Sequence, residues 1–284
     1  MDINFKNVSF IYGEKTPFEK LALDNIDLTI KKGEFVGIIG HTGSGKSTLI
    51  QHFNGILKPT SGDVFIGDMN TKDKTLAKSG LRYKIGLVFQ YPEYQLFEET
   101  IEKDIAFGPK NMGLSETEVT ERVKEAMDLV GLDYEAKKDK SPFEISGGQK
   151  RRVAIAGILA MKPDILILDE PTAGLDPKGR DELFFQIKRL YEKNNITIVL
   201  ISHSMEDVAK LVNRIIIMKN GKIHLDSSTK EAFSDVDDLK KVGLNVPQIT
   251  ELMDILRKKG HHFSKNILTV DEAFSEIKRE LRKN

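Results

Sequence analysis

Residues 35–47 read Phe-Val-Gly-Ile-Ile-Gly-His-Thr-Gly-Ser-Gly-Lys-Ser, and this stretch decides the fold. Its first five residues form a short, continuously apolar run, which is typical of a strand buried on both faces. Apolar residues then recur at helical spacing up to Leu57, so the glycine-rich segment lies between a strand and a helix. Segment 40–47 fits the pattern GxxxxGK[ST], whose backbone N–H groups cradle phosphates in that setting. We therefore predict an α/β nucleotide-binding domain around this loop.

The composition limits what the chain can be. Its 284 residues, 39% hydrophobic and 30% charged, are enough for a full core and one domain with an appendage. Because 43 basic residues balance 43 acidic ones, no net field gathers nucleic acid, and we expect no nucleic-acid partner. The absence of cysteine excludes disulfides and thiolate metal sites. The opening residues lack the apolar segment of a signal peptide, and no apolar run approaches the roughly 18 residues of a membrane span. We expect membrane association only through partners.

Strand patterns flank the phosphate loop on both sides. Apolar residues recur in 3–10 and alternate strictly in 26–30, which predicts two antiparallel strands with one covered face. Two Ile- and Leu-rich runs, 165–168 and 196–201, predict further strands beside 35–39. Parallel strands place their carboxyl ends at one edge of a sheet, and such sheets bind ligands there. We expect the polar residues that follow these runs to meet the phosphate loop.

The remaining segments have helical patterns. Residues from about 90 to 160 are mostly helical, and strand signals fade after about residue 226. The candidate capping boxes are Ser115 with Glu118, and Thr269 with Glu272. The expected organisation is a domain of residues 1–225, with a helical subdomain at about 90–160, followed by a small helical appendage of residues 226–284.

The phosphate loop supplies the first candidate site residues. Lys46 would bridge the β- and γ-phosphates of ATP, and the Ser47 hydroxyl would bind Mg²⁺. Glycines allow the backbone to approach the phosphates closely. The predicted ATP-binding residues of this segment are Gly40, His41, Thr42, Gly43, Ser44, Gly45, Lys46, Ser47 and Thr48.

Two adjacent carboxylates, Asp169 and Glu170, follow the run 165–168. Asp169 would orient Mg²⁺ through its water shell. Glu170 would be the general base that polarises the attacking water. The alternative is a solvated acidic pair that happens to follow a core strand.

Residues 145–149, Ile-Ser-Gly-Gly-Gln, are the most specific feature of the chain. A Ser-Gly-Gly turn that opens a basic helix supplies a second helix N-terminus able to accept a phosphate. Together with the phosphate loop and the acidic pair, this order of motifs resembles the ATPase subunits of ATP-binding cassette (ABC) transporters. The resemblance implies that Ser146, Gly147, Gly148 and Gln149 close over the ATP held by a second subunit, and hence a dimer.

The same resemblance gives roles to further residues. Gln90 matches the glutamine that senses Mg²⁺ and the attacking water, and His203 matches the switch histidine at the γ-phosphate, although a histidine at a strand end is by itself more often structural. Asp176 matches a loop that crosses the dimer interface, and it could at the same time be an ordinary helix N-cap. Tyr12 is the candidate for stacking on adenine, whereas the nearby aromatic residues could belong to the core or to a loop.

The implied fold is a P-loop ABC-type nucleotide-binding domain, with a RecA-like α/β core, an antiparallel β subdomain and an α-helical subdomain, plus the small helical C-terminal domain. Residues 90–100, Gln-Tyr-Pro-Glu-Tyr-Gln-Leu-Phe-Glu-Glu-Thr, and the tail segment 242–247 are similar to segments of energy-coupling factor (ECF) transporter ATPases, closest to the second, or A-prime, ATPase. In that family the first segment lines a groove for the coupling helices of a membrane T protein. Glu93, Glu98 and Glu99 would make such a groove acidic, unless they form only a solvated helix face.

The resemblance implies an ATP-hydrolysing subunit at the cytoplasmic face of the cell membrane, with ATP and Mg²⁺ as cofactors. Its expected partners are a second ABC ATPase, in a heterodimer or, in isolation, a homodimer, the T component, and an S component that captures a vitamin or metal ion. One alternative is an ATPase of another ABC importer or exporter. Ribosome-acting and DNA-acting ABC proteins are disfavoured because a second cassette and long coiled coils do not occur here. An ATP sensor without hydrolysis is disfavoured by Glu170, His203 and Gln149.

Overall fold

The computed structural model describes residues 1–74, 76, 79–194 and 196–282. Its described residues contain a six-stranded sheet, in the order β10-β9-β3-β8-β7-β6, and a four-stranded sheet, in the order β2-β1-β4-β5. The first sheet consists of β3 (Phe35–Ile39), β6 (Ile85–Val88), β7 (Ile165–Asp169), β8 (Thr197–Ile201), β9 (Arg214–Lys219) and β10 (Lys222–Ser228). The second consists of β1 (Ile3–Tyr12), β2 (Lys20–Ile30), β4 (Ser61–Ile66) and β5 (Met69–Asn70).

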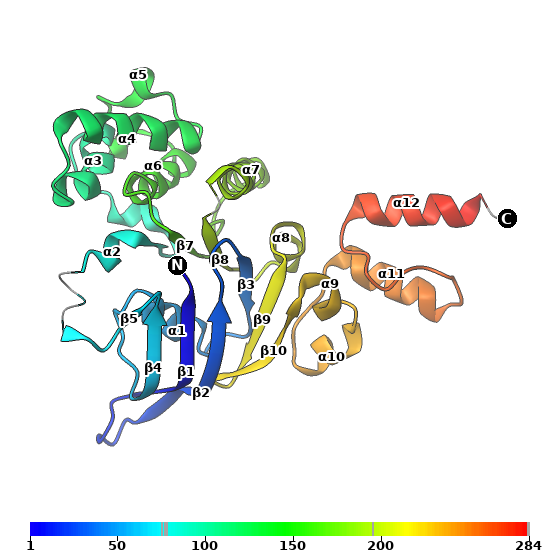
Figure 1. Ribbon diagram of the computed structural model, residues 1–284. Helices are drawn as coiled ribbons and strands as arrows, with labels where there is room; N and C mark the ends of the chain where they lie inside the picture. Colours follow the sequence, from blue (N-terminus) through cyan, green and yellow to red (C-terminus); the bar gives the residue numbers. More distant parts are fainter. Residues whose placement is uncertain (75, 77–78, 195, 283–284) are drawn as a thin grey trace.

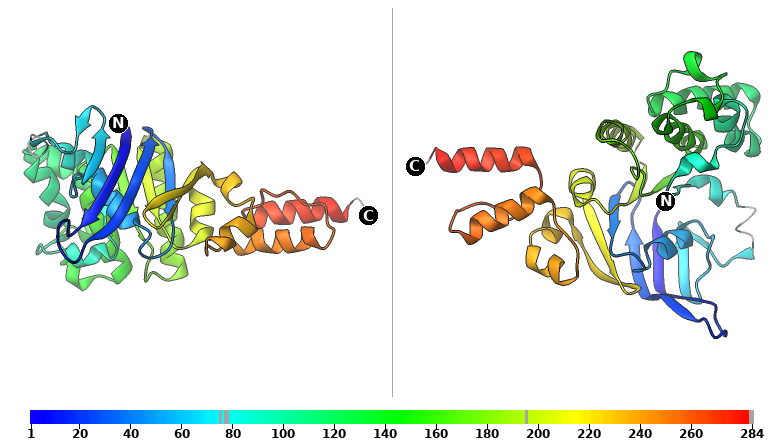
Figure 2. Two further views of the ribbon diagram at one scale, coloured as in Figure 1. Left: turned by 90° about the horizontal axis from the view of Figure 1, so that it is seen from below. Right: turned by 180° about the vertical axis from the view of Figure 1, so that it is seen from behind.

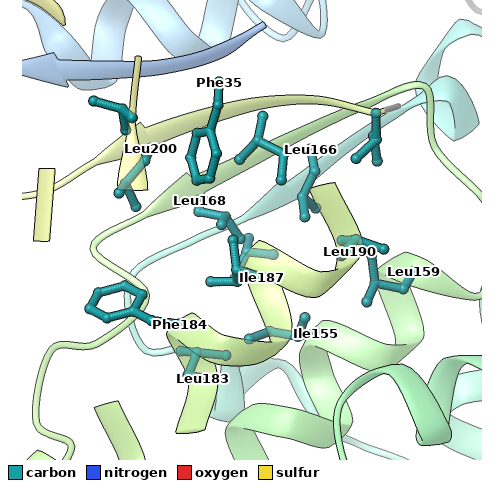
Figure 3. Close-up of a cluster of buried hydrophobic side chains, with 14 of the residues drawn as sticks. Phe35, Ile155, Leu159, Leu166, Leu168, Leu183, Phe184, Ile187, Leu190 and Leu200 are labelled. Atoms are coloured by element: carbon teal, nitrogen blue, oxygen red, sulfur yellow. The ribbon is translucent and has the colours of Figure 1, made fainter. Parts of the chain in front are cut away.

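The five parallel strands of the six-stranded sheet are buried on both faces. Its strands pair in parallel except for β10, which pairs antiparallel with β9. Side chains alternate between two core clusters: Leu166 and Leu168 point to one face, and Ile165 and Ile167 to the other. The first face packs against α6 (Gly147–Leu159) and α7 (Pro177–Asn194), as Figure 3 shows, and the second faces α1 (Lys46–Phe53) and the antiparallel sheet. Two covered faces explain why the strand runs are apolar without a break.

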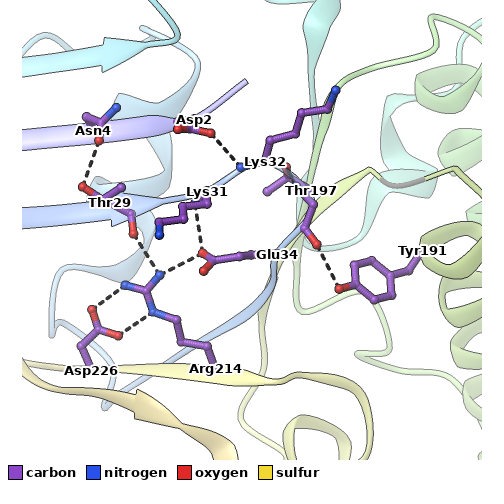
Figure 4. A network of polar contacts seen from close by, with 11 residues as sticks. Asp2, Asn4, Thr29, Lys31, Lys32, Glu34, Tyr191, Thr197, Arg214 and Asp226 are labelled. Carbon is purple, nitrogen blue, oxygen red and sulfur yellow. Dashed lines mark hydrogen bonds and ion pairs between the residues drawn. The ribbon is translucent and has the colours of Figure 1, made fainter.

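Arg214 joins the two sheets (Figure 4). Its Nη1 donates to the Thr29 carbonyl and to Glu34 Oε2, at 2.9 Å each. Its Nε and Nη2 donate to the two carboxylate oxygens of Asp226, at 2.7 Å each. Such a bidentate pair has a fixed geometry. The guanidinium therefore ties β9 and β10 to the end of β2 and to the turn that enters β3.

The helical subdomain lies to one side of the sheets (Figure 1). After α2 (Leu81–Lys84) and β6 it consists of η2 (Pro92–Gln95), α3 (Ile101–Asn111), α4 (Glu116–Leu129), α5 (Tyr134–Lys137), η3 (Pro142–Glu144) and α6. The predicted capping box at α4 is half wrong. Ser115 does accept a hydrogen bond from the Glu118 amide, but the Glu118 carboxylate pairs with Arg122 and does not return to the cap.

The appendage projects on the opposite side (Figure 2). It contains α9 (Thr229–Ala232), α10 (Val236–Lys241), α11 (Gln248–Lys258) and α12 (Val270–Leu281), and α8 (Met205–Leu211) precedes β9. The predicted capping box of Thr269 and Glu272 is confirmed. The boundary expected at residue 226 falls inside β10, and the division into two domains stays a prediction. None of the helices in the described ranges is both long and apolar enough to span a bilayer.

Candidate nucleotide site

Four parallel strands end at one edge of the six-stranded sheet, and each is followed by a predicted site residue. The phosphate loop follows β3, Gln90 follows β6, Glu170 follows β7 and His203 follows β8. They meet at a cleft of about 430 Å³. Its lining residues are Tyr12, Lys20, Ala22, Thr42, Gly43, Gly45, Lys46, Ser47, Thr48, Gln90, Asp169, Glu170 and His203. The expectation that the polar strand ends converge on the phosphate loop is confirmed.

The phosphate loop has a backbone that only glycine can adopt at two positions. Gly40 has φ 151°, and a Cβ there would collide with the Met218 carbonyl and lie 2.7 Å from Ser44 Oγ. Gly45 has φ 105°, and its Cβ would lie 2.7 Å from the Ala22 carbonyl oxygen. Both positions therefore exclude side chains. The loop is pressed against β2 and β9, which fixes its curvature.

Lys46 lies along the loop with its ammonium at the cleft. Its Nζ donates to the carbonyl oxygens of Gly40, at 2.6 Å, and of His41, at 2.9 Å. Burial lowers the pKa of Lys46, and the nearby carboxylates of Glu170 and Asp169 oppose that shift. A triphosphate in the cleft would offer this ammonium a stronger, charge-assisted acceptor than two carbonyls.

Three predicted loop residues do not line the cleft. Gly40 and Ser44 are covered, and the His41 ring turns toward the appendage, where its Nε2 lies 3.0 Å from the Val242 carbonyl oxygen. The motif pattern does not distinguish loop residues that act through the backbone from those that act through side chains. Their part in ATP binding stays a prediction.

Glu170 is held from two other strands. Gln90 Nε2 donates to Glu170 Oε2 at 3.1 Å, and His203 Nε2 lies 2.7 Å from Glu170 Oε1. The Glu170 backbone has φ 49°, in the left-handed region, and its N–H donates to the Ile201 carbonyl. Its side chain is 23% exposed, so this carboxylate is not the freely solvated one of the alternative interpretation. An oriented, partly buried carboxylate next to a phosphate site is suited to accept a proton from water.

The metal-binding prediction rests on Ser47, Gln90 and Asp169, which all line the cleft. They offer hydroxyl, amide and carboxylate oxygens, the hard donors that Mg²⁺ prefers. Burial raises the pKa of Asp169, as does the adjacent Glu170, while Lys46 and His203 oppose the shift; a cation beside the two carboxylates would relieve their repulsion. Among the described residues no cluster of three His, Cys, Asp or Glu could hold a metal. The oxygen donors of Ser47, Gln90 and Asp169 fit Mg²⁺ that arrives with phosphates, since this ion is usually held by few protein ligands.

Tyr12 is the aromatic residue of the cleft. Its hydroxyl lies 3.2 Å from Thr48 Oγ1, and its ring meets Phe10 edge to face at 4.8 Å. Phe18 is exposed and lies outside the cleft lining. The sequence prediction missed Lys20, although Lys20 pairs with Tyr12 across the β1–β2 ladder. A hairpin register drawn through residues 12 and 20 could have placed it beside Tyr12.

The Ser-Gly-Gly-Gln turn lies outside the cleft of its own chain. Ser146 begins α6 as its N-cap and accepts a hydrogen bond from the Gln149 amide at 3.4 Å. Asp176 accepts one from the Gly179 amide at 2.8 Å at the start of α7, so its interpretation as a helix cap is confirmed. None of these residues lines the cleft, and Ser146 is exposed. An exposed helix N-terminus remains available to a phosphate held elsewhere.

A groove of about 480 Å³ lies between residues 95–97, α3 and α6. Its lining residues are Tyr83, Gln95, Leu96, Phe97, Asp104, Phe107, Gly108, Asn111, Ala154, Gly157, Ile158 and Met161. Phe97 and Phe107 meet edge to face at 5.0 Å and are 58% and 48% exposed. Exposed aromatic pairs of this kind mark surfaces that bind partners.

The expectation that Glu93, Glu98 and Glu99 make this groove acidic is wrong. None of the three lines the groove. Glu93 is 17% exposed and forms an ion pair with Arg151 at 2.9 Å, and Glu99 pairs with Lys103 at 2.7 Å. The carboxylate of the groove is that of Asp104, which accepts hydrogen bonds from the backbone amides of residues 97 and 98.

Comparison with known proteins agrees with this geometry. The family model described as ABC transporter matches residues 23–173. The chain is 60% identical over 277 residues to the energy-coupling factor transporter ATP-binding protein EcfA2 of Clostridium tetani. The matched residues cover 98% of this chain and 96% of the relative. It is 57% identical over 284 residues to the EcfA2 protein of Clostridium perfringens, across the full length of both.

Two solved structures show the same arrangement. The cbiO1 protein of Clostridium perfringens, part of the ABC transporter complex cbiONQ, superposes with a TM-score of 0.75 at 40% identity, covering 89% of this chain and 98% of that one. The ATP-binding cassette MJ0796, dimeric in a post-hydrolysis state with ADP and Pi, superposes with a TM-score of 0.70 at 33% identity, covering 80% and 98%. From its motifs, its cleft and these relatives, the chain belongs to the ABC transporter family and, within it, to the ATP-binding proteins of energy-coupling factor transporters.

Proposed function

We propose that this chain binds and hydrolyses ATP as the second ATPase subunit of an ECF transporter, and that hydrolysis drives uptake of a vitamin or metal ion through partner membrane proteins. One observation carries the proposal. The Glu170 carboxylate is held by Gln90 and His203 within the cleft that also contains Lys46 and Ser47. A protein that only sensed ATP would need the phosphate loop but no oriented base.

The chemistry follows from these positions. The loop N–H groups and Lys46 bind the β- and γ-phosphates, and Thr48 and Tyr12 lie toward the adenosine. Ser47 and Asp169 would hold Mg²⁺, which would neutralise charge on the phosphates. Glu170 takes a proton from the attacking water, while Gln90 and His203 orient the carboxylate and the γ-phosphate. General base catalysis of this kind contributes about 10²–10⁴-fold.

The site is completed by a second subunit. Ser146, Gly147, Gly148, Gln149 and Asp176 lie outside the cleft of their own chain, so they are free to close on the nucleotide of a partner. That partner is a second ABC ATPase, in a heterodimer, although the isolated chain could pair with itself. Exposed apolar residues on α11 and α12, Leu252, Ile255, Phe274 and Leu281, add surface for the dimer.

The groove between residues 95–97 and α6 receives a coupling helix of the transmembrane T component, and Asp104 favours a basic residue at its tip. A separate S component chooses the transported substrate. The chain then lies at the cytoplasmic face of the cell membrane and is attached to it only through these partners. Closing and opening of the ATPase pair would move the coupling helices and so reorient the membrane proteins.

Affinity purification from detergent-solubilised native membranes, followed by mass spectrometry, tests this proposal. We expect a second cassette ATPase, one T-type membrane protein and several small membrane proteins. A Phe107→Glu chain should lose the membrane proteins and keep the second ATPase, whereas Phe185→Glu, which changes an exposed aromatic on α7, should keep both. A single conventional permease pair would instead indicate another ABC transporter, and ribosomal or DNA-repair proteins would overturn the proposal.

A further inference from the structure

Arg151 lies in the second turn of α6 and is buried, with 2% of its surface exposed. A guanidinium keeps its charge in proteins, so its burial is costly unless every part of it is paired. The side chain of the neighbouring Arg152 is 23% exposed and forms an ion pair with Glu182 at 3.4 Å. Only the first of these two arginines therefore carries its charge into the interior.

The Arg151 guanidinium is paired with two different segments. Its Nε and Nη2 donate to the two carboxylate oxygens of Glu93, at 3.1 and 2.9 Å. Its Nη1 donates to the carbonyl oxygens of Pro171, at 3.0 Å, and Ala173, at 2.6 Å. The Tyr91 ring lies 5.8 Å from the guanidinium carbon. A lysine could not reproduce this fork, because its ammonium has no fixed planar set of donors.

Each of these segments carries a residue of the proposed reaction. Glu93 is three residues after Gln90 and two before the groove residue Gln95. Pro171 directly follows Glu170, and Ala173 is three residues before Asp176. The helix that bears Arg151 begins at Ser146. One side chain therefore connects residues 93–97, which we call the groove segment, with the peptide after Glu170, the turn before α7 and the helix that follows the Ser-Gly-Gly turn.

We propose that Arg151 is a positioning residue that transmits a displacement of the groove segment to Glu170. A partner that pulls on residues 95–97 moves Glu93, and the bidentate pair passes this movement to Arg151. Arg151 then shifts the carbonyls that follow Glu170, whose left-handed backbone leaves it little freedom to adjust. The inference rests on the proposed function, since it requires Glu170 to be the base and the groove to bind a partner.

The test compares Arg151→Lys with a matched control, Arg122→Lys. Arg122 is also largely buried and also joins a carboxylate, Glu118, to two carbonyls, those of residues 160 and 161. Although Met161 lines the groove from the far side, the hydrogen bonds of Arg122 reach neither residues 93–97 nor residues 170–176. ATP hydrolysis is measured for the complete detergent-solubilised complex and for the chain purified without membrane proteins. Misplacing a catalytic group by about 1 Å can cost about 10²-fold in rate. We expect Arg151→Lys to lower kcat of the complex by about 10- to 10²-fold and to change the KM for ATP by less than about 2-fold.

The ratio of kcat in the complex to kcat of the chain alone is the decisive readout. With Arg151→Lys this ratio should move toward one, and with Arg122→Lys it should stay at the wild-type value. Glu93→Gln removes the charge from the other side of the pair and should act in the same direction, and the double variant should be no worse than the more severe single one. This second variant keeps the test open if Arg151→Lys does not fold.

Three results would overturn the inference: a wild-type ratio of one, a ratio that Arg151→Lys leaves intact, or a ratio that Arg151→Lys and Arg122→Lys change equally, in step with their melting temperatures. Glu170→Gln separates this failure from that of the proposed function. If Glu170→Gln abolishes turnover while Arg151→Lys leaves the ratio intact, only the positioning role is wrong. If Glu170→Gln hydrolyses ATP normally, the proposed reaction is wrong as well.

Discussion

Replacing Tyr12 by alanine should weaken ATP binding without affecting the phosphate contacts. Stacking of a base on an aromatic side chain is worth about 1–3 kcal/mol. Tyr12 is 41% exposed, and its ring is already in edge-to-face contact with Phe10, so we expect the lower half of that range. A loss of about 1–2 kcal/mol corresponds to roughly 5- to 30-fold weaker binding, because about 1.4 kcal/mol is a factor of ten. Tyr12→Phe keeps the ring and loses only the half-exposed bond to Thr48, so its effect should stay within about 3-fold.

The assay is calorimetric titration of the chain with ATP and with inorganic tripolyphosphate, on a Glu170→Gln background that suppresses hydrolysis. Tripolyphosphate has no base, so its affinity should be the same with Tyr12 and with alanine at position 12. Equal losses for both ligands would mean that the ring acts through the phosphate loop. No loss for ATP would mean that Tyr12 does not stack on adenine at all.

Three further predictions concern stability. Leu168→Ala, in the centre of the buried sheet, should lower the free energy of unfolding in urea by about 2–5 kcal/mol, and a loss below about 1 kcal/mol would contradict the packing described. Asp169 has a raised pKa in the folded chain, so the charged carboxylate costs stability at pH values above that pKa, and this cost disappears below the ordinary value of 3.8. Asp169→Asn should therefore stabilise the nucleotide-free chain at neutral pH, by a margin that shrinks as the pH falls toward 3.8. Melting curves over a pH series measure this margin, and a margin that grew toward low pH would contradict the prediction. Gly243→Ala should break the contact between the appendage and His41, because φ is +76° at this position and the new Cβ would lie 2.5 Å from His41 Nε2. Hydrogen exchange of the α10 amides should then become faster. The control Gly260→Ala also has a positive φ, but no atom lies within 4 Å of its Cβ, so hydrogen exchange in α10 should stay unchanged.

The strands and the cleft could be predicted because their signals are local. The run 35–39 is apolar without a break since both faces of β3 are covered, and the glycines at 40 and 45 are required by backbone dihedrals that other residues rarely adopt. The end of the first domain could not be located. Strand β10 is an exposed edge strand with polar residues on one face, so it lacks the apolar signal of the interior strands.

Side-chain partners far along the chain could not be predicted either. The bidentate acceptor of Arg151 is Glu93, 58 residues earlier, and the sequence placed that glutamate in an acidic groove. Likewise, the His41 ring lies against a carbonyl 201 residues later, although the motif assigns His41 to the nucleotide. Motif spacing shows which segments converge, whereas the direction of each side chain depends on tertiary packing.

Single-turnover ATP hydrolysis by the purified complex, with Glu170 or Gln at position 170, tests the proposed reaction most directly. We expect both complexes to bind ATP with similar affinity, and we expect Glu170→Gln to hydrolyse it about 10²–10⁴-fold more slowly. The bound ATP should then persist and hold the two ATPase subunits together. Hydrolysis at the wild-type rate by the Glu170→Gln complex would contradict the assignment of the base, and with it the mechanism drawn from this cleft.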